Sequence, residues 1–328
     1  MKYRQFPARS RPSLRARLRW RLLASVSAAA LFVSVGLHRR AEAEEPPVLP
    51  IVDPGRWQIA FEGRLTAYGG ADTLWSCDCI PLTIGPDYGG DVGVSITRQM
   101  PNGWLASLGI RYGRSFETDE SIQYSYPPFY FGARASHVEQ HGIVDFAVGR
   151  DVGLGLFGNS GGTSTITAGV RIANFQADTD LAYTAGIYTP SPPGYYTIST
   201  PGKIKRSFTG AGPRIAWNGS VPLERNPAFS FDWGVAGALL FGRQKSEFSF
   251  TYSGFVTAYA RKKSVVVPNV EAFAALSWQL PDVPGRFTAG YRVDAFFNVI
   301  DGGHHESESV DRIIHGPFAR FTIELDGP

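Results

Sequence analysis

From residue 57 onward, apolar side chains recur at every second position in about ten stretches, and helical periodicity is nearly absent. This alternation predicts strands over 57–68, 88–98, 104–116, 137–149, 163–175, 206–218, 228–242, 264–278, 286–299 and 312–325. No linker interrupts them, so the sequence predicts a single domain of β-strands.

The stretch RFTAGYRVDAFFNVI (286–300) shows what the alternation means. Successive side chains of a strand point to opposite faces, so Tyr291 and Val299 share an apolar face while Arg292 and Asp294 share a polar one, where Phe296 is the only apolar intruder. Every predicted strand has an ionisable group on its less apolar face and no charge in the middle of the other face.

The apolar face continues over ten strands, and nothing in the sequence is left over to cover it. Closing the sheet into a barrel would turn this face to lipid and enclose the charges in the lumen. The candidate lumen-lining residues are Glu62, Arg64, Asp91, Arg111, Glu139, His141, Asp145, Arg171, Arg214, Asp232, Glu271, Arg292, Asp294, Arg320 and Glu324.

The connections between strands alternate in length. Long segments follow the odd-numbered strands, at 69–87, 117–136, 176–205, 243–263 and 300–311. Shorter ones follow the even-numbered strands, at 99–103, 150–162, 219–227 and 279–285, although 150–162 slightly exceeds 300–311. This pattern is typical of outer-membrane barrels, which have short periplasmic turns and long extracellular loops.

Five tryptophans fall on the apolar face of their predicted strands and lie near the strand ends that are joined by short turns: Trp57, Trp104, Trp217, Trp233 and Trp278. An indole prefers the membrane interface, so we expect an aromatic belt there. The predicted fold is an all-β, transmembrane, antiparallel up-and-down β-barrel of about ten strands, with eight or twelve also compatible.

The N-terminal segment has the features of an export signal. Residues 1–43 hold ten Lys/Arg and one acid, the run 22–37 is apolar, and Ala41-Glu42-Ala43 forms an A-x-A cleavage site. A retained membrane anchor is the alternative. We expect a signal peptide over 1–43, a periplasmic segment over 44–56 and a barrel over 57–328, in the outer membrane of a Gram-negative bacterium.

The net charge of +3 comes from that leader. Without it, 22 basic residues face 28 acidic ones, so the balance offers no support for a nucleic-acid partner.

Three motifs outside the predicted strands favour structural interpretations. GNSGG (158–162) lacks a histidine signature that would make Ser160 a nucleophile, and a Gly-rich turn explains it. Cys77 and Cys79, the only cysteines, favour a local role such as a loop disulfide, with pairing to another molecule as the alternative, since a zinc site needs four ligands. PSPPGYY (190–196) predicts a hairpin that extends above the membrane or folds across the mouth.

A last group of polar residues is His304, His305, Glu306, Glu308 and Asp311. Imidazole and carboxylate suit several metal ions, but a solvated acidic loop is the better interpretation. The sequence therefore predicts no catalytic residue, cofactor or metal, and no enzyme activity.

Several stretches resemble the Legionella-type major outer-membrane protein family of pore formers. They are HGIVDFAVGRDVGLG (141–155), AGVRIANFQADTD (168–180), GPRIAWNGSVPL (212–223), GYRVDAFFNVIDGG (290–303) and DRIIHGPFARFTI (311–323). The resemblance implies an outer-membrane barrel that admits small solutes. We expect its partners to be outer-membrane lipid and lipopolysaccharide, the barrel-assembly machinery and small solutes. One departure is the end Leu325-Asp326-Gly327-Pro328, where many outer-membrane proteins end on an aromatic residue; Phe321 is the nearest here.

Three functions follow from these expectations. The first is a porin-like passive pore for small solutes or ions. Ten strands leave little bore, so conduction would be limited to small species or would need a homo-oligomer. The second is a non-conducting surface barrel, an adhesin or receptor that acts through its long loops. The third and weakest is an outer-membrane enzyme with rim residues Asp301, His304, His305 and Asp311.

Overall fold

The computed structural model describes residues 56–70, 72–77, 80–100, 103–126, 128–153, 162–191, 193–224, 226–252, 255–281, 283–302 and 309–325. The predicted signal peptide, nearly all of the segment 44–56, and Cys79, Ser160, the 304–308 cluster and residues 326–328 lie outside these ranges. None of the described residues forms a helix with the length and hydropathy of a membrane span.

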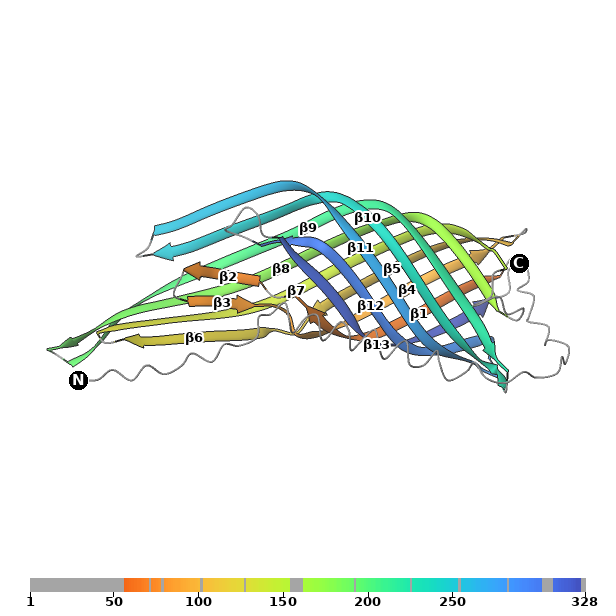
Figure 1. Ribbon diagram of the computed structural model, residues 1–328, viewed down its shortest axis with the longest axis horizontal. Coiled ribbons are helices and arrows are strands. Elements are labelled where there is room, and N and C mark those ends of the chain that lie inside the picture. Colours follow the sequence, from red (N-terminus) through yellow and green to blue (C-terminus); the bar gives the residue numbers. More distant parts are fainter. Residues whose placement is uncertain are drawn as a thin grey trace, which may run out of the picture. The chain divides into compact units, whose positions relative to one another are not determined.

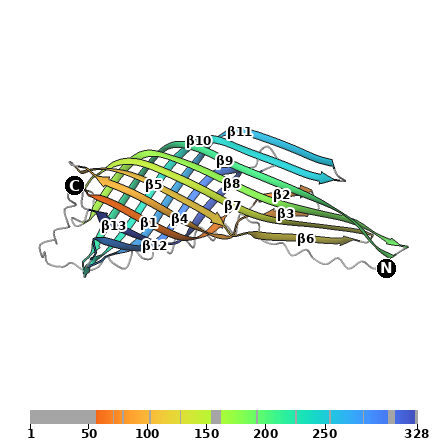
Figure 2. The same cartoon turned by 180° about the vertical axis from the view of Figure 1, so that it is seen from behind.

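The described chain consists of antiparallel strands (Figures 1 and 2). They are β1 (Trp57–Gly69), β2 (Asp72–Cys77), β3 (Ile80–Ile84), β4 (Tyr88–Gln99), β5 (Trp104–Ser115), β6 (Thr118–Tyr126), β7 (Phe129–Asp151), β8 (Thr163–Pro190), β9 (Pro193–Leu223), β10 (Asn226–Tyr252), β11 (Phe255–Gln279), β12 (Gly285–Asp301) and β13 (Ser309–Leu325).

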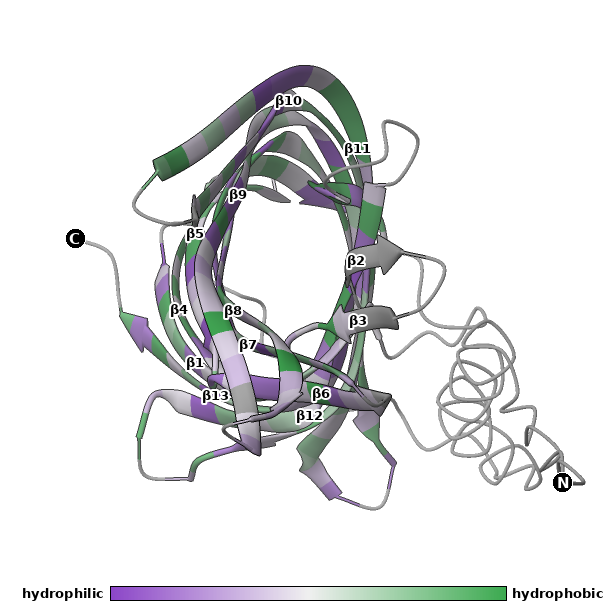
Figure 3. Cartoon of the chain, turned by 90° about the vertical axis from the view of Figure 1, so that its left-hand side faces the viewer, coloured by the Kyte–Doolittle hydropathy of each residue, from purple (hydrophilic) through white to green (hydrophobic). Residues whose placement is uncertain are grey.

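Ten of these strands close into a ring, which Figure 3 shows end-on. Its order is β1–β4–β5–β7–β8–β9–β10–β11–β12–β13, and β13 pairs back to β1 from Trp57↔Leu325 to Gly69↔Ile313. The remaining strand of the sheet, β6, pairs with the start of β7, beyond the stretch that β5 covers. The ring contains the ten strands that the sequence predicts, so the predicted barrel is confirmed.

The two faces of the ring differ as the alternation requires. Large apolar side chains are exposed along the ring strands; Leu239 is 48% exposed, Phe241 59% and Val270 53%. Their neighbours of opposite parity, such as Leu240 and Asn269, are almost completely buried. The exposed set forms an outward apolar belt of the kind that lipid covers in a transmembrane barrel.

One parity assignment is wrong. Val299 was expected on the outward face with Tyr291, but it is fully buried. The cause is a bulge: the register between β12 and β13 shifts between Phe296 and Ile300, and Asn298 takes a left-handed backbone conformation (φ 59°). Between the pairs formed by Phe296 and Ile300, β12 has two more residues than β13, and this irregular stretch turns Val299 inward. Asp311 holds the bulge by accepting a 2.7 Å hydrogen bond from the Asn298 backbone N–H.

Three long connections predicted as loops are largely strand. β8 and β9 remain paired to Pro190↔Pro193, which confirms the hairpin around 190–196. β10 and β11 remain paired to Tyr252↔Phe255, and 117–136 forms β6 and the first part of β7. These stretches lack an outward apolar face, so hydrophobic periodicity could not mark them, yet their backbone groups still pair across the ladder.

The apolar belt predicts a clear labelling pattern. With Cys77 and Cys79 replaced by serine, a cysteine at Leu239 or Val270 in vesicle-reconstituted protein should react with a lipid-soluble maleimide and resist a charged, water-soluble one. A cysteine at exposed Arg243, just beyond the belt, is the control and should react with both. Ready labelling of Leu239→Cys by the charged reagent would contradict the assignment of the belt to lipid.

Candidate functional site: the barrel interior

The interior holds a layer of charges centred on Glu271 of β11. Its carboxylate is 2.7 Å from Nη2 of Arg171, 3.2 Å from Nη2 of Arg111, and 3.7 Å from nitrogens of both Arg214 and Arg292. Arg111 lies on β5, five positions from β11 in the ring of ten, so this contact crosses the full diameter of the barrel.

A second carboxylate extends the layer. Asp294 of β12 is fully buried and accepts hydrogen bonds from Arg64 (2.7 Å) and Arg111 (3.1 Å). Arg64 also donates through Nε to Asp91 at 2.9 Å. These bonds join β1, β4, β5 and β12, so the charges of four ring strands form one connected network.

The network continues toward the short-turn end through Glu62. This carboxylate pairs with Arg292 and accepts a 2.6 Å hydrogen bond from Arg320. Both guanidinium groups lie over the rings of Phe273 and Phe318, at 5.0 to 5.7 Å from the ring centroids. Cation–π contact and ion pairing together offset the cost of burying these cations.

An apolar cluster fills the next level toward the long-strand end. Phe175, Phe208 and Phe296 are almost completely buried and pack with Leu240 and Val267. The centroids of Phe175 and Phe296 are 4.7 Å apart although β8 and β12 are four positions apart in the ring. Phe296, the one apolar side chain on the polar face of its strand, therefore belongs to a small hydrophobic core inside the barrel.

A third set of contacts lies near the mouth. Arg312 of β13 donates to Glu139 of β7 at 2.8 Å, and Nε2 of His137 is 3.1 Å from the same carboxylate. Asp301 pairs there with Arg261 and, at 3.5 Å, with Lys263. Charges thus cross the interior on both sides of the apolar cluster.

Among the described residues, all of the fifteen candidate lumen residues except His141 take part in at least one ion pair between a carboxylate and an arginine. His141 is 3.5 Å from Asp91 and stacks on Phe175, while Asp232 and Glu324 lie near the short turns with Arg286 and Arg56. The structure brings the others together in the network around Glu271 or in the Glu139 pair.

Sequence reasoning missed several interior residues. Arg312 and His137 each begin a predicted strand with the inward parity of Arg320 and Glu139, so strict parity could have found them. Phe175 and Phe208 have no such signal, since an apolar residue on the polar face does not reveal what it contacts.

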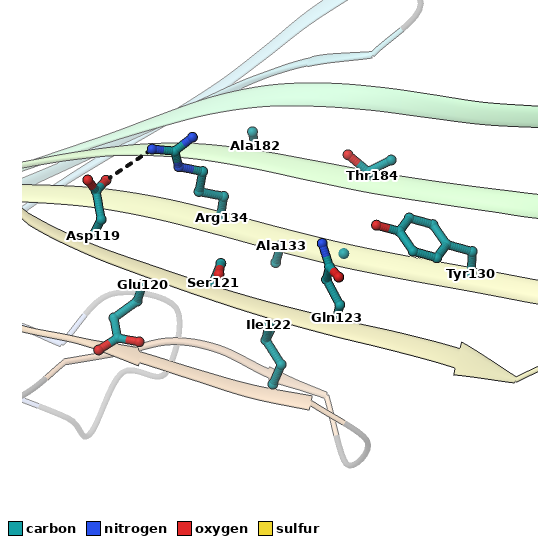
Figure 4. A pocket seen from close by; sticks show the side chains of 11 residues that line it. Asp119, Glu120, Ser121, Ile122, Gln123, Tyr130, Ala133, Arg134, Ala182 and Thr184 are labelled. Carbon is teal, nitrogen blue, oxygen red and sulfur yellow. Dashed lines mark ion pairs between the residues drawn. The ribbon is translucent and has the colours of Figure 1, made fainter.

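A cavity of about 120 Å³ lies beside the charged network. Its lining includes Glu62, Arg111, Asp145, Glu271 and Arg292, so both signs of charge reach it. On the long-strand side a larger, open groove runs over β6, β7 and β8, where exposed Arg134 lies 3.7 Å from Asp119 (Figure 4). Its charged groups are solvated and converge on no common point.

The rim residues named for an enzyme do not form a catalytic group. Asp301 is buried in its ion pairs, Asp311 holds the bulge, and His304 and His305 lie outside the described residues. In the described ranges no group of three or more His, Cys, Asp or Glu could hold a metal ion.

The closed ring, the outward apolar belt and the charged interior define a transmembrane β-barrel of the outer-membrane class. Residues 108–324 match the family described as Legionella pneumophila major outer membrane protein precursor, which is more than half of the chain. The chain belongs to that family of outer-membrane proteins. No curated protein matches it.

Solved structures resemble the chain in fold. The outer membrane protease OmpT from Escherichia coli has 11% identity and a TM-score of 0.50, with 87% of this chain and 99% of that chain covered. OprG from Pseudomonas aeruginosa has 10% identity and a TM-score of 0.30, covering 81% and 96%. A major outer membrane protein from Thermus thermophilus has 12% identity and a TM-score of 0.31, covering 81% and 99%. At these identities the likeness concerns the fold alone.

The network predicts a large stability effect at its centre. Glu271→Gln leaves Arg111, Arg171, Arg214 and Arg292 around a neutral group, and removing one partner of a buried ion pair typically costs about 3–5 kcal/mol. Urea unfolding from lipid vesicles, followed by tryptophan fluorescence, should show a loss of that order. The variant Asp119→Asn, which removes an exposed ion pair, should unfold at the same urea concentration as the wild type. Equal stability of all three proteins would rule out a tightly coupled network.

Proposed function

We propose that this protein is a closed outer-membrane barrel that anchors the strand extensions of β6 to β11 outside the membrane. One observation carries this proposal: side chains from opposite walls meet at successive levels of the interior. Arg111 contacts Glu271 across the diameter, and Phe175 contacts Phe296 beyond it.

Ring size explains the occlusion. Eight-stranded barrels are filled by their own side chains, whereas open aqueous channels typically have about 16 strands. In a ten-stranded ring an arginine and a glutamate can bridge the bore between them. A permeating ion would have to separate buried, hydrogen-bonded charges and then pass the apolar cluster, where it would lose its hydration.

The strand extensions are the part of the molecule available to partners. They expose large side chains well beyond the apolar belt: Phe255 is 79% exposed, Tyr259 61% and Tyr196 57%. Exposed aromatic groups of this kind are enriched at protein interfaces. They support a receptor or adhesin role, and the proposal assigns no enzymatic activity to the chain.

A low-conductance pore is the second candidate. It is favoured by the cavity beside Glu62 and Arg111, and by the fact that side chains rather than backbone close the bore. Side chains change rotamer far more easily than a barrel wall moves. In this alternative, ions pass only while the network is rearranged.

Planar-bilayer recording separates the two candidates. Purified wild-type protein, checked by heat-modifiable gel migration, should give no steady conductance under conditions in which a sixteen-stranded porin does. Stepwise openings from the folded wild type, absent after heat denaturation, would reject the closed barrel and favour the pore.

A deletion tests the role of the extension. Asp180 and Lys203 are cross-strand partners, so residues 181–202 can be replaced by a two-residue Asn-Gly turn without altering the ring. The variant should retain heat-modifiable migration while bacteria that carry it lose attachment to host cells or matrix. If attachment were undiminished, the binding surface would have to lie outside residues 181–202. The control substitution Arg114→Gln, on the ring strand β5, should leave attachment intact.

A further inference from the structure

Basic residues gather on the outward face of β9, β10 and β11, just beyond the apolar belt. We call the following four residues the basic patch: Lys205, Arg243, Lys245 and Lys262. Lys205, Arg243 and Lys262 are exposed and Lys245 is half-buried.

The sheet register brings the patch together. Lys245 and Lys262 are direct cross-strand partners, and Arg243 is the preceding residue of the same face on β10. Lys205 is opposite Glu247, two residues beyond Lys245. Like charges directly opposite each other on neighbouring strands are destabilising, so the arrangement costs stability in the absence of an anion.

The protein supplies two carboxylates beside this group: exposed Asp178 of β8 is the cross-strand partner of Lys205 on one side, and Glu247 of β10 is its partner on the other. Glu247 pairs with Lys245, and its pKa is lowered by a hydrogen bond from Lys245 and by the charges of Lys245, Lys205 and Lys262. Three cations therefore lie close to Glu247. Arg243 and Lys262 have no ion-pair partner among the described residues, which leaves an excess of positive charge.

The level of the patch determines which anions can reach it. On β10 the last strongly exposed apolar residue, Phe241, is followed on the same face by Arg243. On β11, Val266 is followed toward the long-strand end by Ser264 and Lys262. Cations one or two outward positions past the apolar belt lie where lipid phosphates are, and their long side chains can extend to them.

We propose that the basic patch binds the phosphate groups of lipopolysaccharide in the outer leaflet, while the acyl chains of its lipid A lie against Phe241 and Val266. The long-strand end of an outer-membrane barrel faces outward, where this lipid is found. Phosphate oxygens accept charge-assisted hydrogen bonds from Arg and Lys. The inference requires the membrane position of the belt and is independent of whether the barrel conducts.

The opposite side of the ring offers a matched control. Arg114 of β5 is also exposed and one outward position beyond Tyr112. Its cross-strand partners are the uncharged Gly90 and Gln140, so it is a single cation at the edge of the belt. If a single positive charge at the membrane interface were sufficient to bind lipid A, Arg114 would contribute as much to that binding as Arg243.

The test measures binding of fluorescent lipid A to detergent-solubilised, full-length protein. Doubly phosphorylated lipid A should bind the wild type in a salt-sensitive manner, and Arg243→Gln/Lys262→Gln should weaken it about tenfold or more, as expected for the loss of charged hydrogen bonds. Arg114→Gln should stay within about twofold of wild type. Heat-modifiable migration checks that each variant is folded.

Two further probes identify the chemistry. Dephosphorylated lipid A should bind the wild type as weakly as phosphorylated lipid A binds the double variant, and inorganic phosphate should not compete at equal concentration. Equal affinity of wild type and double variant, or equal weakening by Arg114→Gln, would overturn the proposal. Full competition by inorganic phosphate would replace the lipid site with a simple anion site.

Discussion

The pairing of β1 with β13 is the constraint on which the rest of the structure depends. Within hydrocarbon an unpaired backbone N–H or C=O costs several kcal/mol, so a sheet can cross a membrane only without free edges. The first and last ring strands provide the closure from Trp57↔Leu325 to Gly69↔Ile313. Because this closure occurs at ten strands, the interior is narrow, and side chains from opposite walls come within hydrogen-bond distance.

Charged and apolar side chains fill the barrel interior at different levels. Where charged residues face inward, each carboxylate contacts at least one guanidinium group and Glu271 contacts four, because an unpaired charge in this enclosed space would be very costly. Nearer the mouth the same space is filled by Phe175, Phe208 and Phe296. Both arrangements place side chains from opposite walls in contact across the bore. The chain therefore has the architecture of an outer-membrane barrel, and these contacts between opposite walls are what support the proposed closed state.

The alternation of side chains, apart from the sequence stretches that carried the family resemblance, was sufficient to predict the ten ring strands and the belt of apolar residues. It succeeded because lipid imposes the same requirement on every strand: apolar groups outward at every second position. It failed where that requirement ends. The extensions of β8 to β11 are polar on their outward face, so 176–205 and 243–263 had the composition of loops although they are paired strands.

The sequence by itself determined the fold class, the strands of the ring and which side chains share a face, because these depend on local periodicity. Only the tertiary structure decided which charges meet, since Arg111 and Glu271 are far apart in sequence and are joined by ring size and register. It also decided the direction of Val299, because the bulge at Asn298 depends on Asp311 in the neighbouring strand. The same holds for the basic patch, whose four cations come from three strands and become neighbours only through cross-strand pairing.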